Sequence, residues 1–280
     1  MSLRVLRSSL LTVCVALILA STASAREWYT RKSDWNGFEQ YYFEVAERSA
    51  WVVVPTQAAA GNPWIWRARF PGFHAEMDLE LVRQGFHLAY IDVAGMFGSP
   101  KAVAIGDEFH QYLTTQRGLA AKAVMEGVSR GGLFVYNWTV QNPKNVACIY
   151  CDTPVLDFKS WPGGKGSGRG SAGDWKQCLN VYGFTEQQAI GYSGNPVDVA
   201  AAVIVSHKIP VLHIVSENDV IVPPAENTRV LQQQLQMQGY AMPVISVKVG
   251  TKQSSGHHFT HPDPDRVVKF IMKNGMGSKP

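Results

Sequence analysis

The chain has 280 residues, of which 46% are hydrophobic and 17% charged, and its formal net charge is +4 at pH 7. Lys and Arg are scattered without a basic block, which excludes the strongly basic surfaces typical of nucleic-acid-binding proteins and gives no support for an anionic membrane as partner. The length suits one large α/β domain better than two small ones.

The first 25 residues have the features of a secretory signal peptide. Arg4 and Arg7 make a basic start, an apolar run from Leu10 to Ala20 follows, and Ala23-Ser24-Ala25 offers the small side chains that a signal peptidase accepts. The apolar run is too short to span a bilayer as a permanent helix. We therefore expect residues 1–25 to be removed and the protein to be secreted or periplasmic, without a membrane anchor.

Three cysteines, Cys148, Cys151 and Cys178, follow that segment. Two interpretations stay open, because an exported protein can oxidise its cysteines: a Cys151–Cys178 disulfide, or three buried thiols. The Cys-x-x-Cys spacing at 148–151 does not predict a zinc site, since it lies in an apolar run without a second Cys/His pair. The sequence predicts no metal and no organic cofactor.

Short apolar, β-branched runs alternate with amphipathic stretches, which predicts an α/β fold with a mostly parallel sheet and crossover helices. The first two runs are separated by a short turn, and we expect them to form an antiparallel edge. The predicted helices are Ala75–Gln84, Gly131–Gln141, Asn227–Gln238 and Asp263–Lys273. The predicted strands, which make a doubly wound, eight-stranded sheet with right-handed crossovers, are Gln40–Val45, Trp51–Pro55, Trp64–Phe70, Phe86–Asp92, Ala123–Gly127, Val146–Cys151, Val211–Val215 and Pro243–Val249.

The segment from Lys159 to Asp198 interrupts this alternation after the sixth predicted strand. It begins with a Gly-rich stretch and is too long for a simple connection, and Glu186–Ile190 is weakly helical. Its aromatic residues are too many for a disordered linker, so we expect a lid over the carboxyl ends of the strands. Trp161 and Trp175 are its candidate substrate contacts.

The residues Gly127-Val128-Ser129-Arg130-Gly131 form a G-x-S-x-G pattern between a predicted strand and a predicted helix. In this context the pattern indicates a nucleophile elbow, a sharp turn that exposes the serine hydroxyl. The two glycines leave room where strand and helix backbones approach each other. Ser129 would lie at a helix N-terminus, whose dipole favours developing negative charge.

Two later loops carry the partners that such a serine needs, a base and a carboxylate that orients it. The loop after the seventh predicted strand contains Glu217 and Asp219, and the loop after the last strand contains His257, His258 and His261 behind a glycine. A single loop histidine is usually only solvent-exposed, but three in one loop indicate a functional role.

In the elbow, the acidic loop and the Gly-His loop, the chain resembles the α/β-hydrolase superfamily, over nearly all of residues 26–280. The resemblance is closest to bacterial serine esterases and prolyl-oligopeptidase-like hydrolases. It implies the chain order serine, acid, histidine, and therefore a triad of Ser129, Asp219 and His257. Asp219 precedes Pro223 as in the D-x-x-V-P loop of these enzymes.

Alternatives to this triad stay open. Glu217 is the second choice for the acid, and Asp152 or Asp157 after the sixth strand is the third. His258 is the second choice for the base and His261 the third. If His257 is the base, His258 is expected to line the substrate pocket.

The resemblance also implies an oxyanion hole, with one N–H from Arg130, the residue after the nucleophile. The second N–H is expected from the turn after the third predicted strand, where the chain departs from the His-Gly-Gly pattern of many esterases. Pro71 has no N–H, which leaves Phe70 or Arg69 as the donor.

Arg67 and Arg69 are two residues apart on a predicted strand, so we expect them to point to one side of the sheet. Two interpretations of this pair stay open. An arginine at the end of a strand can bind a substrate carboxylate in a bidentate manner, or it can form an ion pair within the protein.

The function that these expectations favour is hydrolysis of a carboxylic ester through an acyl-enzyme, on a small-molecule or polysaccharide substrate such as a uronate ester. A prolyl-oligopeptidase-like peptidase is the first alternative, weakened by the lack of a propeller domain in this sequence. A non-catalytic binding protein on a hydrolase scaffold is the second. A C–C hydrolase or an acyltransferase fits the same triad, and the oligomeric state stays open.

Overall fold

The structure is a computed structural model that describes residues 31–276. The predicted signal peptide and Cys14 lie outside the described residues. One nine-stranded sheet has the order β1-β2-β3-β5-β4-β6-β7-β8-β9. Its strands are β1 (Lys32–Trp35), β2 (Phe38–Val45), β3 (Arg48–Val54), β4 (Trp64–Arg67), β5 (His87–Ile91), β6 (Ala123–Val128), β7 (Val146–Asp152), β8 (Val211–Ser216) and β9 (Val244–Val247).

The sheet is parallel from β5 to β9 and antiparallel at the other edge, where β1, β2 and β3 lead into β5. The mostly parallel α/β fold is therefore confirmed, and so is the antiparallel pairing of the first two predicted strands. The predicted number of eight strands is wrong, because β1 was not predicted. This short edge strand is polar, and its signal lies in the turn, where Asn36 and Gly37 both have the positive φ of a two-residue hairpin.

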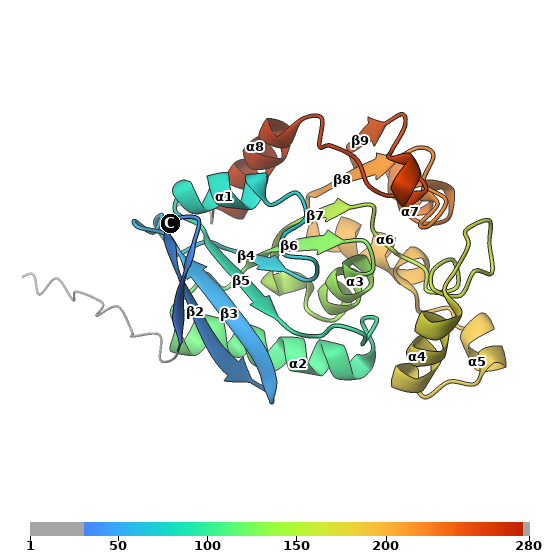
Figure 1. The fold of residues 1–280 in the computed structure, drawn as a ribbon, viewed down its shortest axis with the longest axis horizontal. Helices are drawn as coiled ribbons and strands as arrows, with labels where there is room; N and C mark the ends of the chain where they lie inside the picture. Colours follow the sequence, from blue (N-terminus) through green and yellow to red (C-terminus); the bar gives the residue numbers. More distant parts are fainter. Residues whose placement is uncertain (1–30, 277–280) are drawn as a thin grey trace, which may run out of the picture.

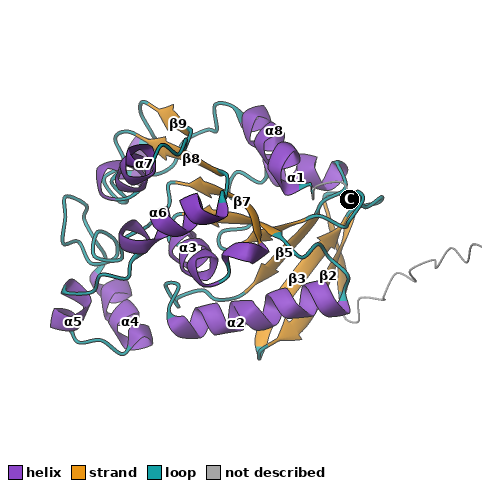
Figure 2. Ribbon diagram, turned by 180° about the vertical axis from the view of Figure 1, so that it is seen from behind, coloured by secondary structure: helices purple, strands orange, loops and turns teal. Residues whose placement is uncertain are grey.

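Helices cover both faces of the sheet. α1 (Glu76–Arg83) and α8 (Pro264–Gly275) pack on one face, and the other face carries α2 (Pro100–Gln111), α3 (Gly131–Gln141), α6 (Pro196–His207) and α7 (Thr228–Met237) (Figure 1, Figure 2). α2 was not among the predicted helices; it begins at Ser99, whose side chain accepts a hydrogen bond from the Ala102 N–H. No helix of residues 31–276 is long and apolar enough to cross a membrane.

The predicted insert contains α4 (Ala172–Tyr182), α5 (Glu186–Ile190) and the start of α6. α4 and α5 lie at one end of the molecule, on the side toward which the arrowheads of β6 and β7 point (Figure 1). Apolar side chains of the insert form a cluster of their own with Phe97 and Leu133. The insert is therefore a packed layer at the carboxyl ends of the central strands.

Candidate active site

The G-x-S-x-G turn between β6 and α3 has the geometry of an elbow. Ser129 has a φ of 52°, which a non-glycine residue adopts only where its surroundings hold it there. The Asp152 carbonyl accepts the Ser129 N–H at 2.9 Å. A Cβ at Gly127 would lie 3.0 Å from Val135 Cγ2, and one at Gly131 would lie 2.9 Å from Arg69 Cβ. Both glycines are thus required by close packing, as the motif predicts.

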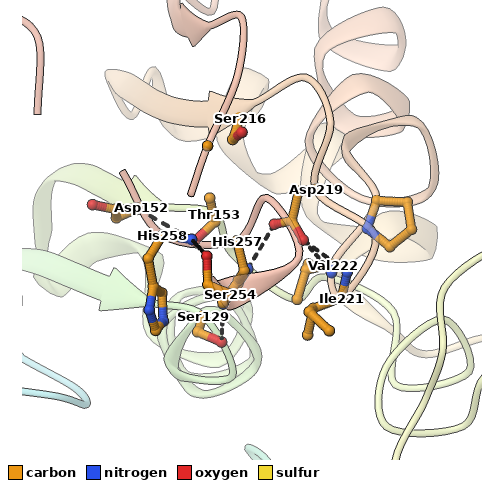
Figure 3. Close-up of polar contacts among 12 residues, drawn as sticks. Ser129, Asp152, Thr153, Ser216, Asp219, Ile221, Val222, Ser254, His257 and His258 are labelled. Carbon is orange, nitrogen blue, oxygen red and sulfur yellow. Dashed lines mark hydrogen bonds and ion pairs between the residues drawn. The ribbon is translucent and has the colours of Figure 1, made fainter. Parts of the chain in front are cut away.

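Ser129, His257 and Asp219 come together in one hydrogen-bonded chain (Figure 3). His257 Nε2 lies 3.0 Å from Ser129 Oγ, and His257 Nδ1 lies 2.6 Å from Asp219 Oδ2. Because the carboxylate accepts the Nδ1 proton, Nε2 is free to accept the proton of the serine hydroxyl. Asp219 is buried, and its Oδ1 accepts the backbone N–H groups of Ile221 at 2.8 Å and Val222 at 2.9 Å.

The loop that carries His257 is held against the loop that carries Asp219. Gly256 has a φ of +87°, and a Cβ there would lie 2.2 Å from the Asn218 carbonyl oxygen. Only glycine fits this position, because a side chain would meet both an unfavourable backbone conformation and a backbone atom. The glycine before His257 therefore serves the approach of the two loops.

The other candidate acids and bases are engaged elsewhere. The Glu217 carboxylate pairs with Arg229 on the surface, and Asp157 Oδ1 accepts the Lys159 N–H at 2.8 Å. His261 is buried, with Nε2 3.1 Å from the Tyr150 hydroxyl. His258 is exposed, and its ring points away from Asp219 (Figure 3).

A second His–Asp pair lies beside the triad, and sequence reasoning missed its histidine. His74 Nδ1 lies 2.5 Å from Asp152 Oδ2, and His74 Nε2 lies 2.7 Å from the Phe259 carbonyl oxygen. Asp152, the third choice for the triad acid, thus pairs with His74 and not with His257. No motif marks His74, because its partners come from β7 and from the loop after β9.

The predicted oxyanion donors are available. Within residues 31–276, neither the Arg130 N–H nor the Phe70 N–H has a hydrogen-bond acceptor. The turn after β4 lies against the elbow, as the close approach of Arg69 to Gly131 requires. Phe70 has a φ of 51°, so the turn carries a strained residue at the expected donor. Its role in an oxyanion hole stays a prediction.

Of the two open interpretations, binding of a substrate carboxylate is wrong for Arg67. Its side chain is fully buried, with Nη1 2.8 Å from Asp78 Oδ2 and 2.5 Å from Glu126 Oε1. Nη2 donates to the carbonyl groups of Phe70 and Phe73. Burial raises the pKa of Glu126 well above its ordinary value, although the Arg67 charge opposes that shift. The ion-pair interpretation is the correct one for this residue.

Arg69 and Arg67 do not share one side of a strand, because β4 ends at Arg67. Arg69 is half-buried, and its guanidinium carbon lies 4.6 Å from the centroid of the Phe70 ring. It remains a candidate for contact with substrate, at the edge of the elbow.

The two tryptophans of the insert are both buried. The Trp161 ring centroid lies 4.5 Å from the guanidinium carbon of Arg130. Arg130 directly follows Ser129 in the chain. Trp175 packs on Phe158, with ring centroids 6.0 Å apart, in the interior of the insert. The packing on Phe158 favours a structural role for Trp175, and contact of either tryptophan with substrate stays a prediction.

Cys148, Cys151 and Cys178 are free and buried. Of the two open interpretations, the Cys151–Cys178 disulfide is wrong: Cys151 lies within β7, and Cys178 is on α4 in the apolar cluster of the insert. No group of three or more His, Cys, Asp or Glu side chains in the described part of the chain is arranged to hold a metal ion.

Comparison with known proteins identifies the fold. No family model matches the chain, and no curated protein matches it in sequence. An acylaminoacyl peptidase in complex with Z-Gly-Gly-Phe-chloromethyl ketone is similar in structure, with a TM-score of 0.63 and 16% identity, over 89% of this chain and 45% of the peptidase. A puromycin-hydrolyzing peptidase of Mycobacterium tuberculosis has a TM-score of 0.61 and 15% identity, over 83% of this chain and 38% of its own.

An esterase of Pyrococcus furiosus matches at a TM-score of 0.55 and 14% identity, over 86% of this chain and 96% of the esterase. The chain thus spans less than half the length of the two peptidases but is similar in size to the esterase. These similarities, together with the sheet order and the elbow, show that the chain has the α/β-hydrolase fold.

Proposed function

We propose that the protein is a serine hydrolase that cleaves carboxylic esters through an acyl-enzyme. The observation that carries this proposal is the hydrogen-bonded chain from Ser129 Oγ through His257 to the buried Asp219. This arrangement has the roles of a catalytic triad, in which the histidine accepts the serine proton and the carboxylate fixes the histidine tautomer.

The reaction proceeds in two halves. Ser129 Oγ attacks the ester carbonyl carbon while His257 Nε2 takes its proton, and the Arg130 and Phe70 N–H groups stabilise the oxyanion of the tetrahedral intermediate. His257 then gives the proton to the leaving alcohol, which leaves an ester between the acyl group and Ser129. Water then attacks this acyl-enzyme while His257 takes its proton, and His257 gives that proton to Ser129 Oγ as the acid leaves, which restores the free serine and the neutral histidine.

For the substrate, we propose an ester on a carbohydrate, such as a uronate ester, outside the cytoplasm. The signal-like residues 1–25 support export, and the half-buried Arg69 beside the elbow offers a guanidinium for a carboxylate of the substrate. Arg130 is less available for that purpose, because it pairs with Asp174 at 2.8 Å.

The test is hydrolysis of activated esters of increasing acyl length by the wild type and by Ser129→Ala. We expect the variant to stay folded and to lose activity by about three to six orders of magnitude. A fluorophosphonate should label Ser129 in the wild type, and Ser206→Ala, a remote serine, should be labelled as the wild type is. Release of methanol or acetate from polysaccharides would then identify the ester class; a Ser129→Ala variant with most of its activity would refute the mechanism.

A peptidase is the second candidate, favoured by the similarity to the acylaminoacyl and puromycin-hydrolyzing peptidases. The same triad forms the same acyl-enzyme from an amide, so the geometry of the triad does not discriminate. Matched ester and anilide substrates with one acyl group discriminate the two: an anilide cleaved as efficiently as its ester would favour the peptidase. A wild type that neither hydrolyses any of these substrates nor reacts with fluorophosphonate would favour a binding protein on this scaffold.

A further inference from the structure

We infer that His74 is a positioning residue for this hydrolysis. Hydrogen bonds from both of its ring nitrogens hold the oxyanion turn, residues 70–74, in place relative to the nucleophile elbow and the histidine loop. The inference rests on the proposed function, because it assigns His74 a role in supporting that same site. His74 would not touch the substrate; it acts through the three segments that it joins.

The partners of His74 require both ring nitrogens to carry a proton. Nε2 faces the Phe259 carbonyl oxygen at 2.7 Å, and a carbonyl oxygen only accepts. Nδ1 faces Asp152 Oδ2 at 2.5 Å, and an ionised carboxylate also only accepts. The side chain is therefore an imidazolium that donates in two directions, unlike His257, whose Nε2 must be free to accept.

The surroundings of His74 favour this charged form. Burial by itself lowers the pKa of His74, but the hydrogen bond and the charge of Asp152, with the Phe259 carbonyl and Glu76, raise it above its ordinary value. Two other titratable groups face it: His261, whose ring is edge-on at 5.4 Å between centroids, and His258, across the Phe73 ring. The pKa of each is lowered, mainly by burial, and the His74 charge contributes to the lowering in both.

The two hydrogen bonds join three parts of the proposed active site. Asp152 is the last residue of β7, and its carbonyl accepts the N–H of the nucleophile Ser129 at 2.9 Å. Phe259 lies two residues after the base His257. His74 itself ends the turn that carries Phe70, the proposed second oxyanion donor. One side chain thus ties the donor turn to the backbone of the nucleophile and to the loop of the base.

Loss of this tie should affect the transition state more than substrate binding. Removing one oxyanion donor costs about 10²- to 10³-fold in kcat in serine hydrolases, and a displacement of about 1 Å can cost about 10²-fold. We expect His74→Gln to lower kcat about 10- to 100-fold and to change KM for a small activated ester less than about threefold. The triad residues remain in place, so Ser129 should still react with a fluorophosphonate, more slowly.

His213→Gln is the matched control. His213 is also a buried histidine with both ring nitrogens in hydrogen bonds, to the Tyr136 hydroxyl at 2.6 Å and to Thr228 Oγ1 at 2.9 Å, but these partners lie on α3 and α7 and not on the turn of residues 70–74 or the histidine loop. Both variants should lower the melting temperature. Well below that temperature, only His74→Gln should lower kcat.

The Asp152→Asn variant tests the charge of His74 through the pH dependence of kcat, which should not change if His74 is only structural. The amide keeps an acceptor for His74 Nδ1 but removes the charge, so His74 should lose its proton at a lower pH than in the wild type. If the imidazolium holds the turn, the alkaline fall of kcat should move to lower pH in Asp152→Asn and be absent from the residual activity of His74→Gln.

The protonation state can be measured directly by ¹⁵N NMR of histidine-labelled protein. Two protonated nitrogens on His74 at pH 7 are expected, and a neutral His74 would overturn the inference even if His74→Gln did not fold. A wild-type kcat in His74→Gln, or an equal loss in His213→Gln, would also overturn it. Failure of the proposed function is distinguishable, because the wild type would then show neither ester turnover nor labelling of Ser129.

Discussion

His257 and His258 are neighbours in the chain, with ring centroids 5.3 Å apart, but it is the His257 ring that meets Ser129 and Asp219. The His257 ring is buried between Ser129 and Asp219, whereas the His258 ring is exposed and packs beside Phe73, with ring centroids 5.1 Å apart. The backbone N–H of His258 donates to Ser254 Oγ, which holds the loop in this orientation. The choice between the two histidines is thus a matter of side-chain direction.

His257→Ala should therefore behave as Ser129→Ala does, with a loss of kcat of several orders of magnitude, because among residues 31–276 only His257 lies within hydrogen-bond distance of the serine hydroxyl. His258→Ala should retain kcat within about tenfold, since the exposed His258 ring packs beside Phe73 and not between Ser129 and Asp219. Steady-state kinetics on one activated ester would compare them. An inactive His258→Ala beside an active His257→Ala would mean that the loop adopts another conformation in solution.

Arg67 is a residue for which the structure selects one of the two roles that the sequence left open. It lies at the end of β4 beneath the oxyanion turn, where it neutralises Asp78 of α1 and Glu126 of β6. Its donation to the Phe70 and Phe73 carbonyl groups makes it a second support of the turn. Removing it would leave two buried carboxyl groups and two carbonyl groups without their donor.

We expect Arg67→Leu to lower the free energy of unfolding by about 3–5 kcal/mol, the usual cost of removing one partner of a buried ion pair. For a domain of this size the melting temperature should fall by about 2–4 °C for each kcal/mol. Thermal melts and kinetics on neutral and anionic esters measure the two effects. A selective rise in KM for the anionic ester, with unchanged stability, would contradict the buried role and restore the carboxylate-binding one.

At the level of elements, the insert is fastened next to the loop that carries Asp219, the proposed acid of the triad. Glu226, just after that loop, accepts hydrogen bonds from the Ser167 N–H at 2.5 Å, from Ser167 Oγ at 2.6 Å and from Ser160 Oγ at 2.5 Å. Burial alone raises the pKa of Glu226, but these donors outweigh it and lower the pKa. Because the pKa is lowered in the folded protein, these hydrogen bonds contribute stability at neutral pH, and we expect that contribution to be lost as the pH falls through the lowered pKa of Glu226.

The two tryptophans of the insert should respond differently to replacement. Trp175 fills the interior of the insert, so Trp175→Ala should cost about 3–5 kcal/mol of stability and affect all esters alike. Trp161 contacts Arg130 next to the nucleophile, so Trp161→Ala should raise KM for a bulky ester more than for a small activated one. Melts and kinetics on two ester sizes test both. An unchanged ratio of large-ester to small-ester efficiency in Trp161→Ala would contradict a lid that selects substrate.

At the scale of the whole molecule, the three cysteines of residues 31–276 are buried in separate places, Cys148 and Cys151 in β7 and Cys178 in the insert, and none is joined to another. Burial raises the pKa of Cys178 to about 12, and it also raises the pKa of Cys148 and Cys151. A thiol with a raised pKa in an apolar environment reacts slowly, because the thiolate is the reactive form.

The melting temperature of the protein without its first 25 residues should therefore not change on addition of dithiothreitol. An alkylating reagent should modify almost no cysteine in the native protein and three in denaturant, as mass spectrometry would count. A fall of the melting temperature on reduction, with only one alkylated cysteine in denaturant, would instead establish the Cys151–Cys178 disulfide.

The sequence by itself determined the elements with strong local signals. The apolar β-branched strands β6, β7 and β8 and the helix α3 were predicted almost to the residue, because periodicity and the elbow glycines are local properties of the chain. The same holds for Ser129 and for the two loops that follow β8 and β9. The polar edge strand β1 escaped prediction because it carries no apolar alternation.

Only the tertiary structure decided which side chains meet. Arg67 became an internal ion pair because α1 and β6 bring two carboxylates to it, and Asp152 became the partner of His74 because β7 ends beside the turn after β4. Trp175 and Cys178 were enclosed because the insert packs its apolar side chains into a cluster with Phe97 and Leu133. These outcomes depend on contacts between segments far apart in the chain, and the free energy of burial that selects them is a property of the packed molecule and not of any local pattern.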